Sequence, residues 1–274
     1  MLVLVTGASA GFGEATCRLL VQKGHQVIGA ARRLERLQDL QQELGAAFLP
    51  VQMDVSDLNS VDVALQNLPS DWQGIEVLVN NAGLALGLEP ADKADFADWL
   101  TMINTNIIGL TYLTRKILPG MDARGRGHVI NLGSVAGTYP YPGGNVYGAT
   151  KAYVKQFSLN LRADLVGKPI RVTNVEPGLC GGTEFSNVRF KGDDDKAAKV
   201  YEKVQYLTAE DIANTIVWVA EQPAHMNVNS IEIMPVAQSF GALPVHREAP
   251  PALPADHFEK QSTSLFQKIK SWFK

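Results

Sequence analysis

The sequence predicts an α/β fold, in which a single domain is built on a doubly wound sheet of about seven parallel strands with helices on both faces. Two observations predict it. Short apolar segments alternate along the chain with longer segments of helical periodicity, as in sheets joined by right-handed crossovers. Several apolar segments, such as 27–31 and 77–79, are continuous, which indicates strands that are covered on both faces.

The predicted elements follow one another in regular order. Strands are expected at residues 2–6, 26–31, 47–52, 75–80, 127–133, 170–176 and 230–234. Helices are expected at residues 12–23, 34–44, 57–68, 94–118, 147–166 and 208–221. Gly24 is a typical helix stop, and Thr208 with Asp211 is typical of a capping box at the start of the last of these helices.

Two segments depart from this alternation. Residues 178–207 form a long insertion after the sixth predicted strand, and insertions of this length are often lids or binding loops. Residues 248–274 form a tail, in which a Pro-rich linker precedes an amphipathic helix with apolar and aromatic residues on one face. We therefore expect one domain over residues 1–247, followed by the tail.

Size and composition exclude several classes of protein. The chain has 274 residues, 46% of them hydrophobic, which suffices for one large domain with a full core. A formal net charge of −3 gives no indication of nucleic-acid binding. The two cysteines, Cys17 and Cys180, lack a partner motif, which favours the reducing cytoplasm over a disulfide framework. No apolar run approaches the roughly 18 residues that span a bilayer, and we expect no signal peptide before the first strand.

A glycine-rich segment follows the first predicted strand. It reads TGASAGFG over residues 6–13 and leads into a predicted helix. Gly7 permits a tight turn, Gly11 lets the backbone approach a pyrophosphate, and Gly13 lets the helix lie close to the strand. The helix N-terminus then offers unpaired N–H groups to phosphate. Contacts to a dinucleotide are therefore expected from Gly7, Ala8, Ser9, Ala10, Gly11 and Phe12.

A tyrosine and a lysine share one face of the fifth predicted helix. Tyr147 and Lys151 are i and i+4, so both side chains project from the same side. A free tyrosine has a pKa of about 10, and a nearby ammonium lowers it, so the pair can exchange protons near neutral pH. Ser134 lies 13 residues before Tyr147, at the carboxyl end of a predicted strand, where open α/β sheets bind ligands.

Six motifs together resemble the short-chain dehydrogenase/reductase family. In order they are TGASAGFG, Asn80–Gly83, Asn106–Gly109, Ser134, Tyr147-x-x-x-Lys151 and Pro177–Gly178. The resemblance covers about residues 1–247 and implies a Rossmann-type domain. Residues 80–91, 143–152 and 176–194 are similar to the bacterial NADP-dependent 3-hydroxy acid dehydrogenases, a group that acts on serine, allo-threonine and 3-hydroxypropionate.

The resemblance implies a role for each matching residue. Tyr147 is the acid/base for the substrate oxygen, Lys151 lowers its pKa and holds the nicotinamide ribose, and Ser134 orients the carbonyl or alcohol. Asn106 helps to hold a water that connects Lys151 to solvent, and Asn81 reaches the cofactor. Further cofactor contacts are implied for Asp54, Val55, Pro177, Gly178, Leu179, Cys180, Gly181, Gly182, Thr183 and Glu184.

Two arginines indicate which cofactor is bound. Arg32 and Arg33 follow the second predicted strand, where NAD-binding members of this fold usually carry an acid for the ribose 2′-hydroxyl. A guanidinium pairs bidentately with phosphate, so the 2′-phosphate of NADP(H) is the expected ligand. The five histidines are scattered without metal-ligand spacing, and we expect no metal.

A small hydroxy acid needs a cation for its carboxylate. The insertion supplies Arg189 and Lys191, and Glu184 could face an amino group, with exposed loop charges as the alternative interpretation of all three. The expected substrate contacts are Ser134, Tyr147, Glu184 and Arg189.

These observations predict an NADP-dependent oxidoreductase that transfers a hydride between nicotinamide and a small 3-hydroxy acid. A broad-specificity NADPH carbonyl reductase is one alternative. A nucleotide-binding sensor without turnover is another, although it would have no need of Ser134, Tyr147 and Lys151 together.

The long helices indicate self-association. Their apolar residues exceed what one face against a sheet requires, which favours packing between subunits; the residues concerned are Leu110, Leu113, Ile117, Phe157 and Leu161. The family resemblance implies that the assembly built on these helices is a homotetramer. Three contacts remain open for the helix of the tail, namely its own domain or a neighbouring subunit, a membrane surface, or a partner protein.

Overall fold

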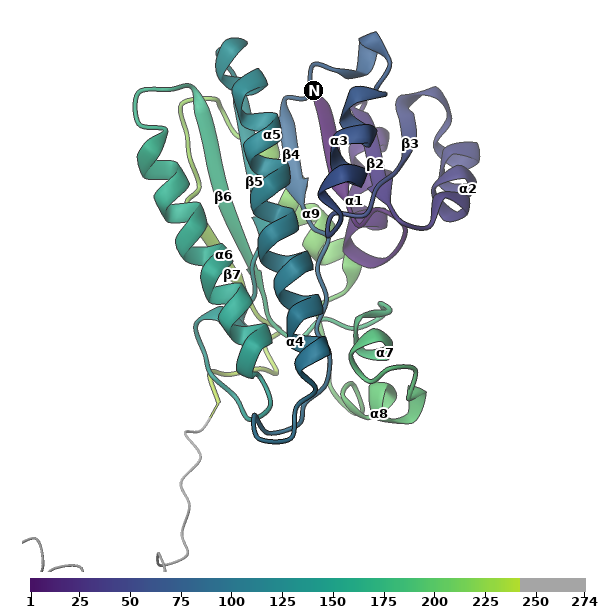
Figure 1. Ribbon diagram of the computed structural model, residues 1–274, viewed down its shortest axis with the longest axis vertical. Coiled ribbons are helices and arrows are strands. Elements are labelled where there is room, and N and C mark those ends of the chain that lie inside the picture. The colour runs from purple at the N-terminus through teal and green to yellow at the C-terminus, as the bar shows by residue number, and fades with distance from the viewer. Residues whose placement is uncertain (242–274) are drawn as a thin grey trace, which may run out of the picture. The chain divides into compact units, whose positions relative to one another are not determined.

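A parallel sheet forms the centre of the structure (Figure 1). The computed structural model describes residues 1–241, and the predicted linker and helix at 248–274 lie outside the described residues. The seven strands of this sheet run in the order β3-β2-β1-β4-β5-β6-β7, and every neighbouring pair is parallel. They are β1 (Leu2–Thr6), β2 (Gln26–Ala31), β3 (Phe48–Gln52), β4 (Val77–Asn80), β5 (Gly127–Leu132), β6 (Ile170–Pro177) and β7 (Ser230–Ile233). The predicted α/β fold is confirmed.

Helices connect the strands as crossovers. They are α1 (Gly11–Gln22), α2 (Leu34–Leu44), α3 (Leu58–Gln66), α4 (Phe96–Ile103), α5 (Leu110–Ala123), α6 (Asn145–Asp164), α7 (Phe185–Arg189), α8 (Asp194–Lys199) and α9 (Ala209–Ala220). A π-helical segment, Asn104–Gly109, joins α4 to α5. Short 3₁₀ turns lie at Gly45–Ala47, Ser70–Trp72 and Val135–Gly137. The predicted capping box of Thr208 and Asp211 begins α9.

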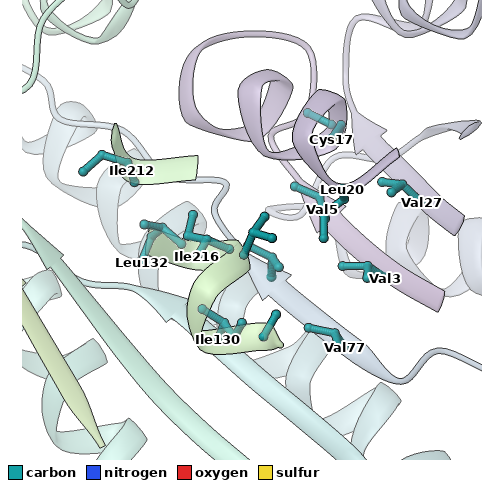
Figure 2. Packing of buried hydrophobic residues seen from close by; sticks show 14 of the residues in the cluster. Val3, Val5, Cys17, Leu20, Val27, Val77, Ile130, Leu132, Ile212 and Ile216 are labelled. Carbon is teal, nitrogen blue, oxygen red and sulfur yellow. The ribbon is translucent and has the colours of Figure 1, made fainter. Parts of the chain in front are cut away.

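The strands between the two edges of the sheet, β2, β1, β4, β5 and β6, bury both of their faces, because successive side chains point to opposite sides of the sheet. In β1, Val3 and Val5 pack with α1, α2 and α9, whereas Leu2 and Leu4 pack with α3, α5 and α6. Figure 2 shows the first of these two cores, in which Cys17 and Leu20 of α1 lie against β1 and β2. Cys17 is therefore a core residue.

The apolar residues of the long helices α5 and α6 pack within this chain. The five apolar residues that suggested surplus surface are covered by this chain itself: Leu110, Leu113, Ile117 and Leu161 are buried, and Phe157 packs on the same core. The inference of self-association from these residues was wrong, because α5 and α6 bury a broad face against the sheet. Other apolar side chains of α4–α6 are exposed, namely Phe96, Leu100, Ile108, Tyr153 and Leu159.

The insertion folds into two short helices at the carboxyl end of the sheet. Figure 1 shows α7 and α8 below the strands, on the side where β1, β4 and β5 end. The strand order reverses between β1 and β4, and this switch point of the sheet is where open α/β folds bind ligands. The fold thus brings the glycine-rich segment and the insertion to the same edge.

The close approach of α1 to β1 gives a test of the glycine-rich turn. A Cβ added at Gly13 would lie 2.6 Å from Asn81 Nδ2 and against the carbonyl oxygen of Gly7. We expect Gly13→Ala to lower the free energy of unfolding by about 3 kcal/mol, because the Gly7 backbone and the Asn81 side chain must both shift. Urea denaturation measures this. Gly74→Ala is the matched control, since nothing lies within 4 Å of its added Cβ, and a loss there of similar size would contradict the account.

Candidate active site

The turn after β5 and the start of α6 bring Ser134 and Tyr147 to the carboxyl edge of the sheet. The two segments pack without intervening side chains: a Cβ on Gly137 would lie 2.7 Å from the Lys151 carbonyl carbon, and one on Gly148 would lie 2.9 Å from the Ala136 oxygen. Ser134 caps its turn by accepting a hydrogen bond from Ala136 N at 3.1 Å. This capping hydrogen bond is compatible with the substrate position predicted for Ser134.

Tyr147 and Lys151 are buried side by side. Tyr147 is 8% exposed and Lys151 7% exposed, and the Lys151 Nζ lies 5.8 Å from the centre of the Tyr147 ring. Lys151 Nζ donates a hydrogen bond to the Leu132 carbonyl oxygen at 2.7 Å, at the end of β5. Burial lowers the pKa of Lys151 to about 8, because the apolar surroundings disfavour the ammonium.

The predicted lowering of the Tyr147 pKa by Lys151 is not found in the protein itself. Burial raises the pKa of Tyr147 above its ordinary value, because the phenolate is desolvated. The Ser134 hydroxyl, through hydrogen bonding, and the Arg189 charge act in the opposite direction and lower the pKa. The positive charge that counters burial thus comes from Arg189 of the insertion.

Asn106 lies in the π-helical segment and is 1% exposed. Its Oδ1 accepts a hydrogen bond from Leu84 N at 2.9 Å, and its Nδ2 donates to Leu84 O at 2.8 Å and to Thr150 Oγ1 at 3.1 Å. Asn106 therefore ties the chain after β4 to α6, one residue before Lys151. π-Helical turns inside α-helices are frequent at functional sites.

The residues directly after β4 fix the glycine-rich turn through hydrogen bonds. Asn81 Nδ2 donates a hydrogen bond to Thr6 O at 2.8 Å, and the Thr6 hydroxyl accepts from the backbone N–H groups of Asn81 and Ala82 at 3.0 and 2.9 Å. Gly7 and Gly11 have φ of 65° and 54°, a region that favours glycine. The observed function of Asn81 is thus to fix the turn on which a dinucleotide would rest.

The N-terminus of α1 has the features of a phosphate cradle. Its N-cap residue, Ala10, makes no side-chain capping hydrogen bond, and a Cβ on Gly11 would lie 3.2 Å from the Thr183 methyl group. Ala8 and Ser9 are both buried, which leaves backbone as the main surface of the turn. These residues fit a pyrophosphate, because donors are offered without a competing side chain.

Arg33 lies over this turn. Its Nε and Nη2 donate to the Ser9 hydroxyl at 3.3 and 3.2 Å, and Nη2 also pairs with Glu184 at 2.8 Å. Arg32 is exposed beside it at the end of β2. Two guanidinium groups at this position fit a 2′-phosphate.

Two of the predicted cofactor contacts, Asp54 and Val55, follow β3. Val55 is 8% exposed, and Asp54 accepts hydrogen bonds from Ser56 N at 2.9 Å and from the Ser56 hydroxyl at 2.7 Å. Gly109 packs directly on the Val55 carbonyl, which fixes this corner against the π-helical segment.

Residues 177–184 run from β6 back across the glycine-rich turn. The Pro177 oxygen accepts a hydrogen bond from the Ser134 hydroxyl at 3.4 Å, and Gly178 N donates to Ile233 O at 2.7 Å. Cys180 and Leu207 form an isolated parallel β-bridge through their backbones. Burial raises the pKa of the Cys180 thiol to about 12. The same stretch therefore touches the Ser134 side of the site and, through Thr183, the α1 side.

Arg189 is the cation nearest to Tyr147 among those proposed from the insertion. Its guanidinium carbon lies 5.6 Å from the centre of the Tyr147 ring, and Nη2 donates to the Tyr141 hydroxyl at 2.7 Å. Lys191 instead pairs with Asp98 at 2.8 Å, with its side chain 59% exposed. Glu184 pairs with Arg33 and with Arg36, at 2.7 Å, rather than with a residue beside Tyr147.

Sequence analysis missed two residues of this region. Arg36 of α2 meets Glu184, which lies 148 residues further along the chain, so no local signal could have found it. Phe185 packs edge-on against Tyr147, with ring centres 5.8 Å apart. An aromatic residue directly after Glu184 was the only available signal for that contact.

The sequence matches a known protein family. The family model described as short chain dehydrogenase matches residues 1–194. The chain therefore belongs to this family, and the predicted membership is confirmed.

Particular relatives cover nearly the whole chain. The NADP-dependent 3-hydroxy acid dehydrogenase YdfG of Salmonella typhimurium is 61% identical over 247 residues, which are 90% of this chain and 100% of the relative. The serine 3-dehydrogenase of Rhizobium radiobacter is 53% identical over 247 residues, 90% of this chain and 98% of the relative. A closed form of serine dehydrogenase complexed with NADP+ matches with a TM-score of 0.90 and 58% identity, covering 90% of this chain and 100% of that chain.

Residues 1–241 contain no group of three or more His, Cys, Asp or Glu side chains that could hold a metal ion. Over the same described part of the chain, no helix combines the length and the apolar character that crossing a membrane would require.

The buried ammonium of Lys151 gives a pH-dependent prediction. Its pKa is about 8 in the folded protein and 10.5 in the reference state, so between these values the unfolded chain binds a proton that the folded chain lacks. Lys151 therefore destabilises the fold fully below about pH 8, and this cost disappears as the pH rises toward 10.5. We expect the cofactor-free Lys151→Met variant to gain stability over the wild type at pH 7, and the gain to shrink by roughly 1.4 kcal/mol per pH unit in that window.

Urea denaturation at a series of pH values measures this difference. Lys168→Met, at an exposed lysine that pairs with Asp122, is the control for removing one lysine charge. A gain for Lys151→Met that stays constant between pH 7 and 10 would contradict the buried-ammonium account.

Proposed function

We propose that this protein is an NADP-dependent dehydrogenase that oxidises small 3-hydroxy acids of the serine, allo-threonine or 3-hydroxypropionate type. One observation carries the proposal: the guanidinium carbon of Arg189 lies 5.6 Å from the ring of the buried Tyr147. A cation for a carboxylate thus stands next to a phenol suited to proton transfer. The relatives named for NADP, 3-hydroxy acids and serine support the same conclusion.

The substrate is held at both ends in this proposal. The hydroxyls of Ser134 and Tyr147 bind the oxygen of the reacting carbinol, and the Arg189 guanidinium binds the carboxylate through charge-assisted hydrogen bonds. Tyr141 holds Arg189 in place through its hydroxyl. The short distance from Arg189 to Tyr147 favours acids in which only a few bonds separate the carboxylate from the hydroxyl.

Tyr147 removes the hydroxyl proton of the substrate. Bound NADP+ supplies the acceptor for the hydride that leaves the carbinol carbon. Because burial opposes the phenolate, the charge of Arg189 is needed to stabilise it, and the Lys151 ammonium also lies beside the ring. A pKa of about 8 lets Lys151 give up or take a proton near neutral pH, and we propose that Asn106 helps to hold the water that connects it to solvent.

Cofactor binding is assigned to the turn and the sheet edge. The glycine-rich turn at 7–12 would hold the pyrophosphate, Arg32 and Arg33 the 2′-phosphate, and Asp54 with Val55 the adenine. Residues 177–183 would cover the nicotinamide side, and Lys151 would hold its ribose, whereas Glu184 pairs with Arg33 and Arg36. The uncapped N-terminus of α1 and the contact of Arg33 with Ser9 support these assignments.

The proposal extends to assembly and compartment. Exposed apolar side chains on α4, α5 and α6, among them Phe96 and Leu159, support a homotetramer. Both cysteines are free thiols, which supports a cytoplasmic enzyme. Residues 1–247 are proposed as the catalytic domain, with the tail at 248–274 docking on a neighbouring subunit or a membrane surface.

Arg189→Ala tests the carboxylate site. We expect the KM for serine and 3-hydroxypropionate to rise by roughly tenfold to a hundredfold, because a charge-assisted hydrogen bond is lost. The KM for a neutral carbonyl substrate should change little. Absorbance of the reduced nicotinamide measures turnover with NADP(H) and NAD(H) over this panel.

Lys191→Ala is the matched control, since this cation of the same segment pairs with Asp98. If Lys191→Ala raises the KM for acid substrates and Arg189→Ala does not, Lys191 and not Arg189 binds the carboxylate. Turnover of neutral carbonyls alone would favour the broad carbonyl reductase, and no turnover with any substrate would favour the sensor.

A further inference from the structure

Glu184 joins two parts of the protein that are distant in sequence. Its Oε2 pairs with Arg33 Nη2 at 2.8 Å, and its Oε1 pairs with Arg36 Nη1 at 2.7 Å. Arg33 precedes α2 and Arg36 lies in its first turn, whereas Glu184 immediately precedes α7. Each carboxylate oxygen thus has its own guanidinium. Because three charged groups form one network, the contact is stronger than an isolated surface pair.

The ionised state of Glu184 is maintained by these partners. The Arg33 and Arg36 guanidiniums hold the pKa of this carboxyl below its usual range. Its side chain is 43% exposed at the rim of an open hollow of ≈ 570 Å³, which Arg33, Asn187 and Gly192 also line. Glu184 makes no side-chain capping bond to α7, so forming the helix does not require the carboxylate.

Charge balance keeps the arginines available to a phosphate. Arg32, Arg33 and Arg36 carry three positive charges, and Glu184 removes one. A phosphate monoester carries about −1.5 to −2 at neutral pH, which the remaining charge matches. Glu184 and a 2′-phosphate can therefore bind to the same arginine cluster together.

The other end of α7 reaches the proposed substrate site. Glu184 precedes the helix and Arg189 is its last residue. Because a helix rises about 1.5 Å per residue, the two residues are less than about two turns apart along its axis. Arg189 Nε donates to Gly87 O at 3.3 Å, and Gly87 N donates back to Arg189 O at 2.9 Å. Phe185, between the two ends, packs on Tyr147.

We propose that Glu184 is a positioning residue for acid substrates: by anchoring α7 to Arg33 and Arg36, it holds the Arg189 guanidinium beside Tyr147. This inference rests on the proposed function, in which Arg189 binds the carboxylate. It assigns to the arginine cluster of β2 and α2 a second function besides cofactor recognition, namely that of fixing the substrate-binding helix.

Glu184→Gln tests the anchor, because it removes the charge and keeps the size. We expect the KM for a 3-hydroxy acid to rise about fivefold, while the KM for a neutral carbonyl substrate stays within about twofold. In the cofactor-free enzyme, the backbone amides of 185–190 should exchange hydrogen for deuterium faster than in the wild type, as measured by mass spectrometry.

Arg36→Gln and the double variant Glu184→Gln/Arg36→Gln complete a double-mutant cycle. Arg36 contacts the carboxylate on the side away from Ser9, so its loss should give a similar rise in KM, and the double variant should be no worse than either single variant. Asp195→Asn, at an exposed acid of the same insertion, is the matched control and should change neither readout.

Two results would overturn the proposal. One is an unchanged acid KM with unchanged exchange in Glu184→Gln, and the other is an equal rise in KM for acid and neutral substrates. If the wild type turns over no hydroxy acid, the proposed function fails, and the substrate half of this inference fails with it. The exchange of residues 185–190 then decides separately whether Glu184 anchors α7.

Discussion

The burial of Tyr147 and Lys151 at the carboxyl edge of the sheet is the constraint on which the site depends. Burying an ammonium is costly unless it has a partner, and the carbonyl at the end of β5 provides one. The close packing of Gly137 against α6 keeps the turn of Ser134 in contact with the helix that carries the pair. The same burial that holds the groups in place also raises the pKa of the phenol, so nearby positive charge becomes a requirement for proton transfer.

The insertion supplies much of what the sheet edge lacks. It brings Arg189 to Tyr147, passes over the glycine-rich turn at Thr183, and meets the arginines of β2 and α2 through Glu184. The insertion thus extends from the proposed 2′-phosphate position to the proposed carboxylate position. The start of α7 thus meets the arginines proposed for the cofactor, and its end carries the arginine proposed for the substrate.

Periodicity and motifs predicted the sheet and its main helices, because continuous apolar strands and helix caps are local signals. They failed where the outcome depends on distant contacts. The helix predicted at 94–118 continues past Pro119 to Ala123, since Met121 is buried in the core, and its π-helical segment depends on the fit of Gly109 against Val55. Helices as short as α7 form only with tertiary support. The Ser134, Tyr147 and Lys151 cluster was predictable from spacing, whereas the partner of Glu184 was not.

Replacement of Tyr147 by Phe tests the central claim, that this buried phenol carries the proton. The phenyl ring keeps the packing on Phe185 and removes only the hydroxyl. We predict that kcat with NADP+ and a 3-hydroxy acid falls by at least about a hundredfold, while the Kd of NADPH measured by fluorescence stays within about threefold. Turnover within tenfold of the wild type, with NADPH binding intact, would contradict the account.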